Sequence, residues 1–421
     1  MKKPMNTRTA IATFSQGHKS LELYGQLIAR NLTITSKVTP QLGTESFDLI
    51  VFHAGDIPPK HQAYIAEISG TPIKFIDVKK TGPKSALNPQ NFRSSQIAEE
   101  LTRPSLTQHL CHFWFVDFLD YLPGYSHLIH IDDATLILGF PNIIEIMQSE
   151  KQQFVCAAQF DQNPSNMVAL VEFSKFFRAC FAEAPMEFPY PFMVPRTNCM
   201  AISLEYLRNN TRFIQFQQAI KNSGMIFTHS WGLGALWGTF AMLYMTPEEK
   251  VMLQPSISFL DCYTGAVINP LPNQLEGLVN VALQKPATVN AEYYPPFDGV
   301  ESAAGNLVSG VFEGKYTMHT EPTDNPYWQV DLLQPTNIQA IQIFNRGDGQ
   351  QLRAKGLLIE ISENGSDFNT IHTQEEIFGG KNQSPLLLDL RMMHKTCTAQ
   401  FLRIRIPRHE CLHLDQVEIY S

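Results

Sequence analysis

The hydrophobic pattern of this 421-residue chain changes near residue 285. From about Lys285 to Ser421, short runs alternate apolar and polar residues, and turn signals such as Glu363-Asn-Gly365 separate them. Such alternation is typical of strands buried on one face, and Gly and Asn accept the positive φ of tight turns. The clearest runs are Trp328–Leu332, Ile338–Phe344, Gly356–Ser362, Phe401–Ile406 and Gln416–Tyr420. This segment predicts an antiparallel β-sandwich.

The earlier part of the chain has a different rhythm, in which apolar strands alternate with helical spacing. Ala10–Phe14, Phe47–Phe52 and Ile73–Asp77 are strand-like, and Leu21–Asn31 carries apolar residues at helical intervals. Strands that alternate with helices predict a largely parallel, doubly wound sheet covered on both faces. The fold class is therefore α/β followed by all-β, with ligands of the first part expected beyond the carboxyl ends of the strands.

Prolines mark the join between the two patterns. Asn269–Pro272 and Lys285-Pro286 interrupt regular structure, because proline cannot continue a helix or a central strand. We expect domains at residues 1–283 and 284–421, with Gln274–Gln284 forming one helix between them.

Composition limits the classes of function. The net charge of -8 gives no basic footprint, so no nucleic-acid partner is expected. The longest apolar stretch, Trp231–Met245, is too short and too rich in glycine to span a bilayer, so no transmembrane segment is predicted. Seven scattered cysteines without a CxxC motif, and no visible secretory signal, favour reduced thiols and a cytoplasmic location.

One strand of the first part ends in carboxylates. The apolar run that begins at His127 delivers Asp132 and Asp133 at its tip. Carboxylates at such a position suit a divalent metal that offsets the charge of a nucleotide-sugar diphosphate. Strand-terminal aspartates are more often caps or turn residues, which remains the alternative. His127 and His130 alternate with apolar residues on the strand and are interpreted as packed beneath the sheet.

Further segments extend this pattern into a family resemblance. They are Leu110–Trp114, Tyr125–Ala134, Phe154–Phe160, Arg196–Ser203 and Ser230–Gly232. Together they resemble the retaining α-1,2-mannosyltransferases. The resemblance implies a GT-A, Rossmann-like domain, a GDP-sugar donor and Mn²⁺, and it places Asp132 on the leading position of an acidic-Pro-Asp motif.

The chain departs from this motif pattern at three positions. Ala134 stands where the motif has its aspartate, Leu233 stands where an aspartate follows the Trp-Gly pair, and His112 replaces an arginine. These departures leave three interpretations open: a shifted metal site, a site that works without metal, or a degenerate transferase.

In the first interpretation Asp133 becomes a ligand, and His229 or Asp261 completes the set, because histidine is an ordinary ligand of divalent metals. The candidate donor- and metal-binding residues are therefore Asp132, Asp133 and His229, with Mn²⁺ or Mg²⁺ as the cofactor and a GDP- or UDP-sugar as the donor. A histidine hydrogen-bonded within a packed loop is the alternative for His229.

The sandwich segment carries a second candidate site. His319 precedes an Arg-x-Asp-x4-Arg cluster made of Arg346, Asp348 and Arg353. Two planar guanidinium groups and an imidazole, which we expect to donate one more hydrogen bond, suit the adjacent hydroxyls of a neutral sugar. The alternative is that Arg346 and Asp348 pair as loop charges.

This segment also resembles a known family. The matching residues are Phe297–Gly299, Met318–Thr320, Pro326–Leu332, Asn345–Asp348, Arg353, Ser362–Gly365 and His413–Tyr420. They resemble discoidin (F5/8 type C) domains, and most closely the F-type, fucose-binding lectins. The resemblance implies a jelly-roll β-sandwich in which His319, Arg346 and Arg353 bind the sugar and Asp348 orients an arginine.

The same resemblance implies a structural calcium ion, for which Asp298 and Glu418 are the corresponding residues. Oxygen ligands suit that ion. Gly349-Gln350 replaces the adjacent cysteines of many F-type lectins, which leaves fucose specificity open.

Taken together, these patterns predict a glycosyltransferase that moves a hexose from a nucleotide sugar to a glycan or polysaccharide acceptor, with a sugar-binding module at its carboxyl-terminal end. The alternative is a non-catalytic carbohydrate-binding protein with a degenerate transferase domain. A role in docking another polypeptide is a third possibility.

Overall fold

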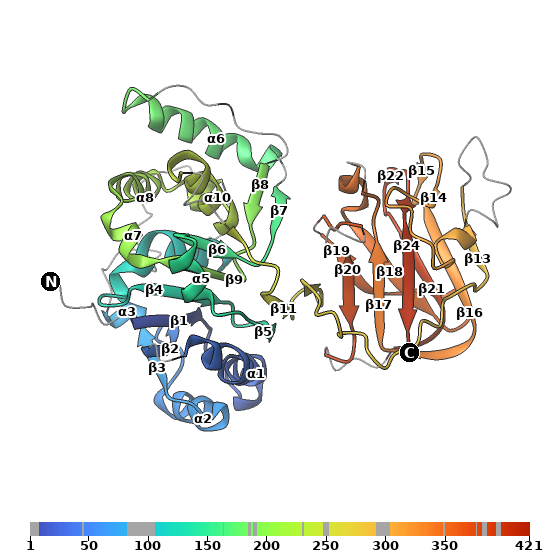
Figure 1. Ribbon diagram of the computed structural model, residues 1–421, viewed down its shortest axis with the longest axis horizontal. Coiled ribbons are helices and arrows are strands. Elements are labelled where there is room, and N and C mark those ends of the chain that lie inside the picture. The colour runs from blue at the N-terminus through green and yellow to red at the C-terminus, as the bar shows by residue number, and fades with distance from the viewer. Residues whose placement is uncertain are drawn as a thin grey trace. The chain divides into compact units, whose positions relative to one another are not determined.

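The protein divides into two compact units, residues Met1–Ile257 and Ser258–Ser421, each with its own core (Figure 1). The computed structural model describes residues 8–43, 46–81, 106–162, 164–183, 187, 192–229, 231–246, 252–291, 304–347, 350–375, 377–380, 385–392 and 397–421.

The division falls before the predicted boundary at 283/284, because the intervening residues pack within the second unit. Ala266 and Ala282 are part of the sandwich core, and Gln274 Nε2 donates to Asp389 Oδ2 at 2.8 Å. The single helix expected over Gln274–Gln284 does not form. These residues make turns, and Gly277 has a φ of 82°, which a right-handed helix does not accommodate.

A seven-stranded mixed sheet organises the first unit, in the order β10-β6-β9-β4-β1-β2-β3. The strands are β1 (Arg8–Phe14), β2 (Ser46–His53), β3 (Ile73–Asp77), β4 (His127–Ile131), β6 (Phe154–Cys156), β9 (Cys199–Ser203) and β10 (Met252–Leu253). β3, β2, β1 and β4 are parallel, as predicted, whereas β9 runs antiparallel to β4 and β6. The carboxyl ends of the four parallel strands therefore share one edge.

Helices cover both faces of this sheet (Figure 1). α1 (Gly25–Thr33) and α2 (Pro59–Ser69) pack on the face that contains Val51. The neighbouring residue Phe52 points to the opposite face, where it packs on the π-helical turn η5 (Phe113–Asp117). The helices α8 (Thr211–Ser223) and α10 (Leu233–Tyr244) contribute to the same core. This alternation follows from the period of two in a strand.

Aromatic residues fill much of the core of the first unit. Phe113, Trp114, Phe115, Phe118, Trp237 and Phe240 are all buried. The other elements of the first unit are η1 (Leu21–Tyr24), η2 (Ile34–Val38), η3 (Thr39–Leu42), α3 (Val78–Thr81), α4 (Leu106–His112), η6 (Phe118–Tyr121), β5 (Thr135–Gly139), α5 (Ile143–Ser149), β7 (Gln159–Gln162), α6 (Pro164–Ala179), β8 (Phe192–Pro195), α7 (Leu204–Asn209) and α9 (Met225–Thr228).

The second unit is an antiparallel β-sandwich, as its alternating pattern predicts. One sheet has the order β13-β16-β21-β18-β19 and the other β20-β17-β24. Their strands are β13 (Ala287–Val289), β16 (Tyr327–Ile338), β17 (Ala340–Phe344), β18 (Leu357–Ser362), β19 (Asn369–Gln374), β20 (Leu386–Asp389), β21 (Cys397–Arg405) and β24 (Gln416–Tyr420). Trp328, Ile404, Ile343 and Val417 meet in the core between the sheets.

Short strand pairs complete the second unit. They are β11 (Ser258–Asp261) with β12 (Val267–Ile268), β14 (Met318–His319) with β23 (His413–Leu414), and β15 (Thr323–Asp324) with β22 (His409–Glu410), and a 3₁₀ turn, η7 (Gln351–Ala354), precedes β18.

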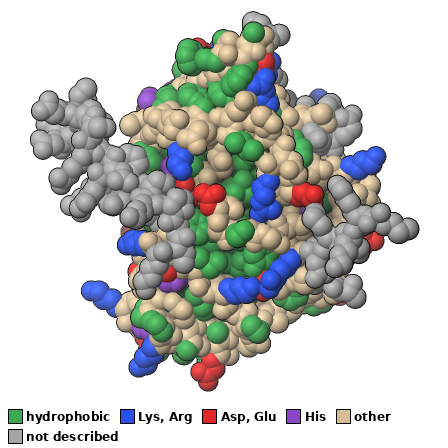
Figure 2. Space-filling view, turned by 90° about the vertical axis from the view of Figure 1, so that its left-hand side faces the viewer, with side chains coloured by type: hydrophobic (Ala, Val, Ile, Leu, Met, Phe, Trp, Pro, Cys, Tyr) green, Lys and Arg blue, Asp and Glu red, His purple; other side chains and the backbone are tan. Residues whose placement is uncertain are grey.

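No helix in the described part of the chain is long and apolar enough to cross a membrane. Figure 2 shows one face of the first unit, on which the described basic and acidic side chains lie interspersed among polar and apolar ones. That face presents no continuous basic surface among the residues described.

Candidate functional sites

Asp132 lies at the carboxyl end of β4, where the chain turns toward β5. Its backbone N–H donates to the Asn198 carbonyl at 2.9 Å, and its carbonyl accepts from the Thr135 N–H at 3.2 Å. The carboxylate is 35% exposed. The turn therefore holds Asp132 at the edge where open α/β sheets bind ligands, with its side chain reaching solvent.

His130 contacts this carboxylate from within the strand. The ring is 1% exposed, as expected for a packed residue, and lies against Trp114 with the ring centroids 4.2 Å apart. Nδ1 is 2.8 Å from the Thr197 carbonyl, so this nitrogen carries the proton. Nε2 is 3.2 Å from Asp132 Oδ1 without hydrogen-bond alignment. His130 is therefore both packed in the core and in contact with the Asp132 carboxylate.

A fully buried arginine stands beside the acidic turn. Arg30, on α1, donates from Nε to the Ile131 carbonyl at 3.0 Å and from Nη1 to Asn31 Oδ1 at 2.8 Å. Nη2 has no hydrogen-bond partner among the described residues. Burial lowers the pKa of Arg30 to about 10, and the carboxylates of Asp133 and Asp132 oppose that shift. The sequence signals Arg30 only as a charge among the apolar residues of a helix.

His229 and Asp261, the other two candidate ligands, hydrogen-bond to residues close to them in the sequence. His229 follows α9, is exposed, and has its Nδ1 2.8 Å from Thr228 Oγ1. Asp261 belongs to the second unit, where its Oδ1 accepts from the Tyr263 N–H at 2.9 Å. Among the described residues, no three His, Cys, Asp or Glu side chains form a group that could hold a metal ion.

Asp132 and the imidazole of His130 would supply two protein ligands to an ion such as Mn²⁺. Mn²⁺ and Mg²⁺ bind proteins through one or two carboxylates and take their remaining ligands from substrate phosphates and water. Mn²⁺ also accepts an imidazole. The buried Nε2 of His130, which lacks an aligned hydrogen bond, supports the fit.

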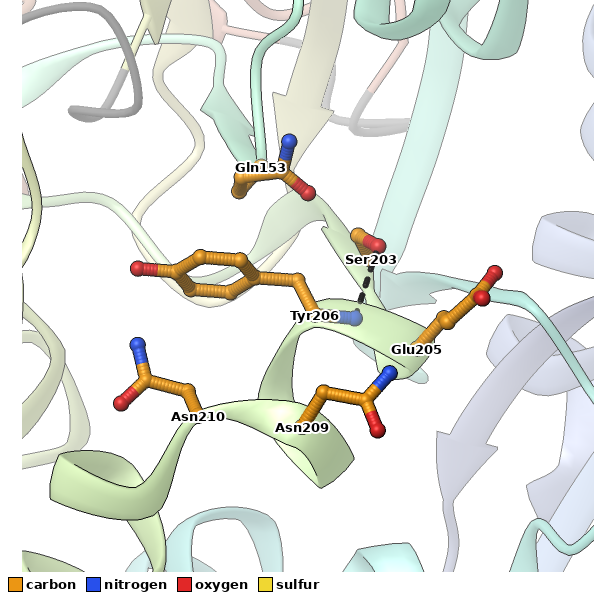
Figure 3. Close-up of a pocket in the computed structure, with 6 residues that line it drawn as sticks. All are labelled: Gln153, Ser203, Glu205, Tyr206, Asn209 and Asn210. Carbon is orange, nitrogen blue, oxygen red and sulfur yellow. Dashed lines mark hydrogen bonds between the residues drawn. The ribbon is translucent and has the colours of Figure 1, made fainter.

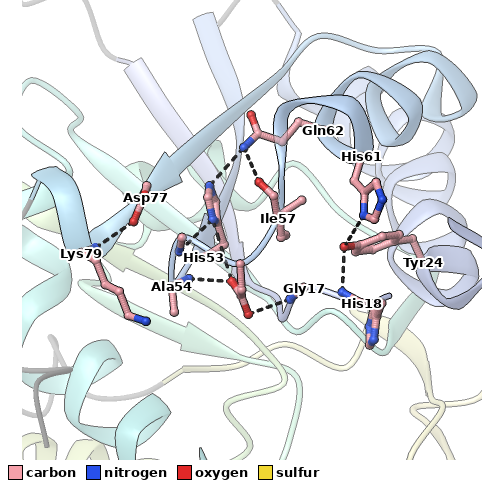
Figure 4. A network of polar contacts seen from close by, with 12 residues as sticks. Gly17, His18, Tyr24, His53, Ala54, Ile57, His61, Gln62, Asp77 and Lys79 are labelled. Atoms are coloured by element: carbon pink, nitrogen blue, oxygen red, sulfur yellow. Dashed lines mark hydrogen bonds and ion pairs between the residues drawn. The ribbon is translucent and has the colours of Figure 1, made fainter. Parts of the chain in front are cut away.

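A polar network lies at the same edge of the sheet, after β1, β2 and β3 (Figure 4). The Asp56 carboxylate accepts from the Gly17 N–H at 2.8 Å and from the Ala54 N–H at 3.0 Å. The Tyr24 hydroxyl accepts from the His18 N–H at 2.8 Å. These contacts order the loops next to Asp132, and the sequence pattern did not indicate them.

Gly17 is required by this network. A Cβ atom at this position would lie 1.9 Å from the Asp56 carbonyl oxygen. Glycine therefore permits the loop after β1 to approach the loop after β2, and the Ser-Gln-Gly sequence that follows β1 is the signal for it in the sequence.

A separate polar hollow of about 450 Å³ lies at the opposite edge (Figure 3). Its lining residues are Gln153, Ser203, Glu205, Tyr206, Asn209 and Asn210. Ser203 pairs with His127 at the amino-terminal end of β4, away from Asp132, and its hydroxyl caps α7 by accepting from the Tyr206 N–H. The hollow is therefore separate from the edge that carries the carboxylates.

The sandwich brings together two of the predicted sugar-binding residues. His319 lies on β14, and Arg346 follows β17. Tyr316 contacts both: its ring is 4.5 Å from the Arg346 guanidinium carbon and 5.2 Å from the His319 ring. Arg346 is 7% exposed, so its guanidinium is largely withdrawn from bulk water.

The third predicted residue, Arg353, lies on η7. Its carbonyl accepts from Arg408 Nη2 at 2.7 Å, which anchors this turn, and its side chain is 3.9 Å from Glu410. Asp348 lies outside the described residues, so its expected role in orienting an arginine stays a prediction.

A backbone carbonyl fixes one nitrogen of His319 as a donor. Nδ1 is 2.6 Å from the Thr320 carbonyl, so Nδ1–H donates there, and in the neutral ring Nε2 holds the lone pair. Burial lowers the pKa of His319, and the Arg346 and Arg353 guanidinium groups push it in the same direction. A neutral His319 presents an acceptor at Nε2, whereas the sequence interpretation assigned it a donor.

A second histidine stands behind the first. His413, the partner of His319 across β14 and β23, is 1% exposed. Neither ring nitrogen has a hydrogen-bond partner among the described residues. Burial lowers the pKa of His413 to about 3, and Arg346 adds to this effect. His413 is therefore neutral at physiological pH and backs the candidate sugar site with an uncharged ring.

The expected calcium ligands stay predictions. Asp298 lies outside the described residues. Glu418 lies on β24, and its Oε2 accepts from the Tyr420 hydroxyl at 2.6 Å. The buried Asp415 carboxylate instead organises the loop before His319, because it accepts from the Glu313 and Gly314 N–H groups at 3.1 and 3.0 Å.

The first unit is similar in structure to a mannosyltransferase. Core-mannan synthase A (CmsA/Ktr4) from Aspergillus fumigatus, in its Mn/GDP form, is 12% identical with a TM-score of 0.47, over 60% of this chain and 74% of that chain.

The second unit matches a family model and curated relatives. Residues 288–413 match the F5/8 type C domain. Fucolectin-6 of Anguilla japonica is 31% identical over 144 residues, which cover 33% of this chain and 74% of the relative. A fucolectin from the serum of the striped bass, Morone saxatilis, is 26% identical with a TM-score of 0.30, over 34% of this chain and 49% of that chain. Through the F5/8 type C domain of its second unit, the chain belongs to the fucolectin family.

Proposed function

We propose that this protein is a glycosyltransferase that moves a hexose from a nucleotide sugar to a glycan acceptor, and that its second unit binds a sugar of that acceptor. The observation that carries the proposal is the acidic turn at Asp132, held at the carboxyl edge of the parallel strands beside the ordered loop of Gly17 and Asp56. In open α/β sheets this edge is where nucleotides bind.

The residues at this edge have distinct tasks in the proposed reaction. Asp132, with Asp133 beside it, would hold a divalent cation, which when bound offsets the charge of the diphosphate and helps the nucleotide diphosphate to leave. Arg30 places a fixed positive charge under the two carboxylates, so that the turn keeps its shape before the donor arrives. The bonds from Gly17 and Ala54 to Asp56 order the loops against which a nucleotide would rest.

The sandwich supports recognition of a neutral sugar. Arg346 supplies donors in a planar fork, and His319 supplies an acceptor at Nε2, so a hydroxyl between them can both accept and donate. Tyr316 fixes the positions of both groups. The name of the fucolectin relatives makes fucose the first sugar to test.

Transfer is tested directly with a panel of GDP- and UDP-sugars in the presence of Mn²⁺, by following hydrolysis or transfer. We expect turnover of at least one donor and its loss in Asp132→Asn. Asp120→Asn is the matched control, because that aspartate is exposed on η6 in the same unit. If no donor is turned over and none shifts the melting temperature, the transferase proposal is wrong.

A second candidate function is carbohydrate binding without catalysis. Ala134 and Leu233 stand where the resembled transferases carry aspartates, and no three-ligand metal group occurs among the described residues. Binding on a glycan array that is abolished by Arg346→Ala, together with no affinity for nucleotides, would establish this alternative. Arg403→Ala is the control for Arg346→Ala. Arg403 lies on β21, where its guanidinium packs over the rings of Tyr327 and Phe368.

A further inference from the structure

We propose that His130 is a ligand of a divalent cation, and that its Nε2 and the Asp132 carboxylate together form the protein's half of that site. The inference rests on the proposed function and deepens it, since it names the atoms that bind the cation at the donor edge. It assigns a role to a histidine whose burial alone indicates packing.

The orientation of the imidazole is fixed by the backbone. A carbonyl oxygen only accepts, so the 2.8 Å contact between His130 Nδ1 and the Thr197 carbonyl places the proton on Nδ1. In the neutral ring the lone pair is then on Nε2, which lies next to the carboxylate. Metal-binding histidines have this arrangement, in which the second ring nitrogen donates to a carbonyl and thereby fixes the tautomer.

The distance between the two donor atoms fits a shared ion. His130 Nε2 and Asp132 Oδ1 are 3.2 Å apart and are not aligned as a hydrogen bond. Two neighbouring ligands of an octahedral ion, each about 2.1 Å from it, lie about 3.0 Å apart. A lone pair and a carboxylate oxygen at this distance repel each other, and either a proton or a cation between them removes that repulsion.

The surroundings make the imidazole rigid and leave the carboxylate accessible. Trp114 packs on the His130 ring, which is 1% exposed, whereas the Asp132 side chain is 35% exposed. An ion on these two atoms would meet protein on one side and solvent on the other. Phosphate oxygens and water would complete its coordination, which explains how the site could function with Ala134 in place of a carboxylate.

The proposal is tested by pulsed electron paramagnetic resonance of Mn²⁺ bound to the full chain, with and without GDP or UDP. A directly coordinated imidazole nitrogen gives a ¹⁴N modulation of the Mn²⁺ signal, and labelling with ¹⁵N-histidine changes that modulation without any substitution. We expect the modulation in the unsubstituted protein and its loss in His130→Gln. His127→Gln, on the same strand, should keep it.

Mn²⁺ affinity gives a second readout. Loss of a group that merely orients a ligand already lowers metal affinity by about 10- to 100-fold, so His130→Gln should lower it by at least that much. Circular dichroism verifies the fold of each variant. If His130→Gln does not fold, the ¹⁵N-histidine experiment shows whether a histidine binds the ion, and a modulation that persists in both His229→Gln and His127→Gln supports His130.

Three results would overturn the inference. A nitrogen signal that survives in His130→Gln and disappears in His229→Gln would assign the ligand to His229. Nucleotide-dependent Mn²⁺ binding without any histidine modulation would show that His130 is only an ion-pair partner of Asp132, while the proposed transferase remains. Absence of binding for Mn²⁺, GDP and UDP alike would reject the cation site and the transferase together.

Discussion

At the scale of single residues, backbone carbonyls and burial decide what each histidine can do. His130 and His319 both place their Nδ1 against a carbonyl, at 2.8 and 2.6 Å, so each presents Nε2 as the atom with the lone pair. His413 has no such partner among the described residues, and burial lowers its pKa to about 3, which favours the neutral form at physiological pH. His130 and His319 thus share one arrangement, and His413 differs from them because it lacks a carbonyl partner among the described residues.

His413 should make the second unit sensitive to acid. Its pKa falls from an ordinary 6.5 to about 3 in the folded state, so the unfolded chain binds the extra proton. Stability contributed by the neutral ring is complete above pH 6.5 and is lost as the pH falls from there toward 3. Each pH unit corresponds to about 1.4 kcal/mol, so about 2 kcal/mol should be lost by pH 5.

The measurement is urea unfolding at pH 7 and pH 5. His413→Leu should remove most of this loss, because leucine does not titrate and the ring makes no hydrogen bond among the described residues. His409→Leu, at a histidine that is 66% exposed, should unfold like the unsubstituted protein. An unchanged pH dependence in His413→Leu would show that other groups cause it.

Candidate residues next to a recognisable strand end could be predicted. Residues that reach the site from distant parts of the sequence could not. Asp132 could be proposed from the sequence because it follows an apolar strand. Arg30 reaches the Ile131 carbonyl from 101 residues away, and His130 acquires its tautomer from Thr197, 67 residues away. No local pattern encodes such contacts.

At the scale of elements, local periodicity predicted where strands lie but not the direction in which neighbouring strands pair. β1, β2 and β3 were found within one or two residues, because each is an apolar run between turn signals. The antiparallel direction of β9 was not predicted, since strand direction depends on tertiary pairing. The helix predicted over Gln274–Gln284 does not form for a local reason, the positive φ of Gly277.

Gly17→Ala should damage the edge that the proposed donor site needs. The added Cβ would lie 1.9 Å from the Asp56 carbonyl oxygen, so the loops after β1 and β2 must separate. We expect a loss of about 1–3 kcal/mol from the stability of the first unit, as for other over-packed positions, and weaker nucleotide binding.

Gly25→Ala is the matched control. It lies in α1 with a φ of -53°, and an added Cβ would meet nothing within 4 Å. It should leave stability unchanged or raise it by up to about 1 kcal/mol. Thermal unfolding of the three proteins measures the difference, and equal melting temperatures for Gly17→Ala and the unsubstituted protein would contradict the close approach of the loops.

At the scale of the whole molecule, two cores support two candidate sites. The α/β unit ends at Ile257, and the sandwich includes the segment from Ser258 that the proline pattern assigned to its neighbour. Prolines mark breaks in regular structure, but they do not indicate which core a segment joins. Ala266 and Ala282 pack in the sandwich core, and nothing in the sequence around them indicates this. The sandwich site and the acidic turn lie in different units, so each can be tested by a variant of its own.

The central claim is that the acidic turn of the first unit binds a nucleotide through a divalent cation. Isothermal titration calorimetry of the full chain with GDP and with UDP, each with and without Mn²⁺, tests it most directly. We expect one nucleotide to bind only when Mn²⁺ is present, and Asp132→Asn to abolish that binding while Arg346→Ala preserves it. Failure of both nucleotides to bind in the presence of Mn²⁺, or binding that Asp132→Asn leaves intact, would contradict the claim.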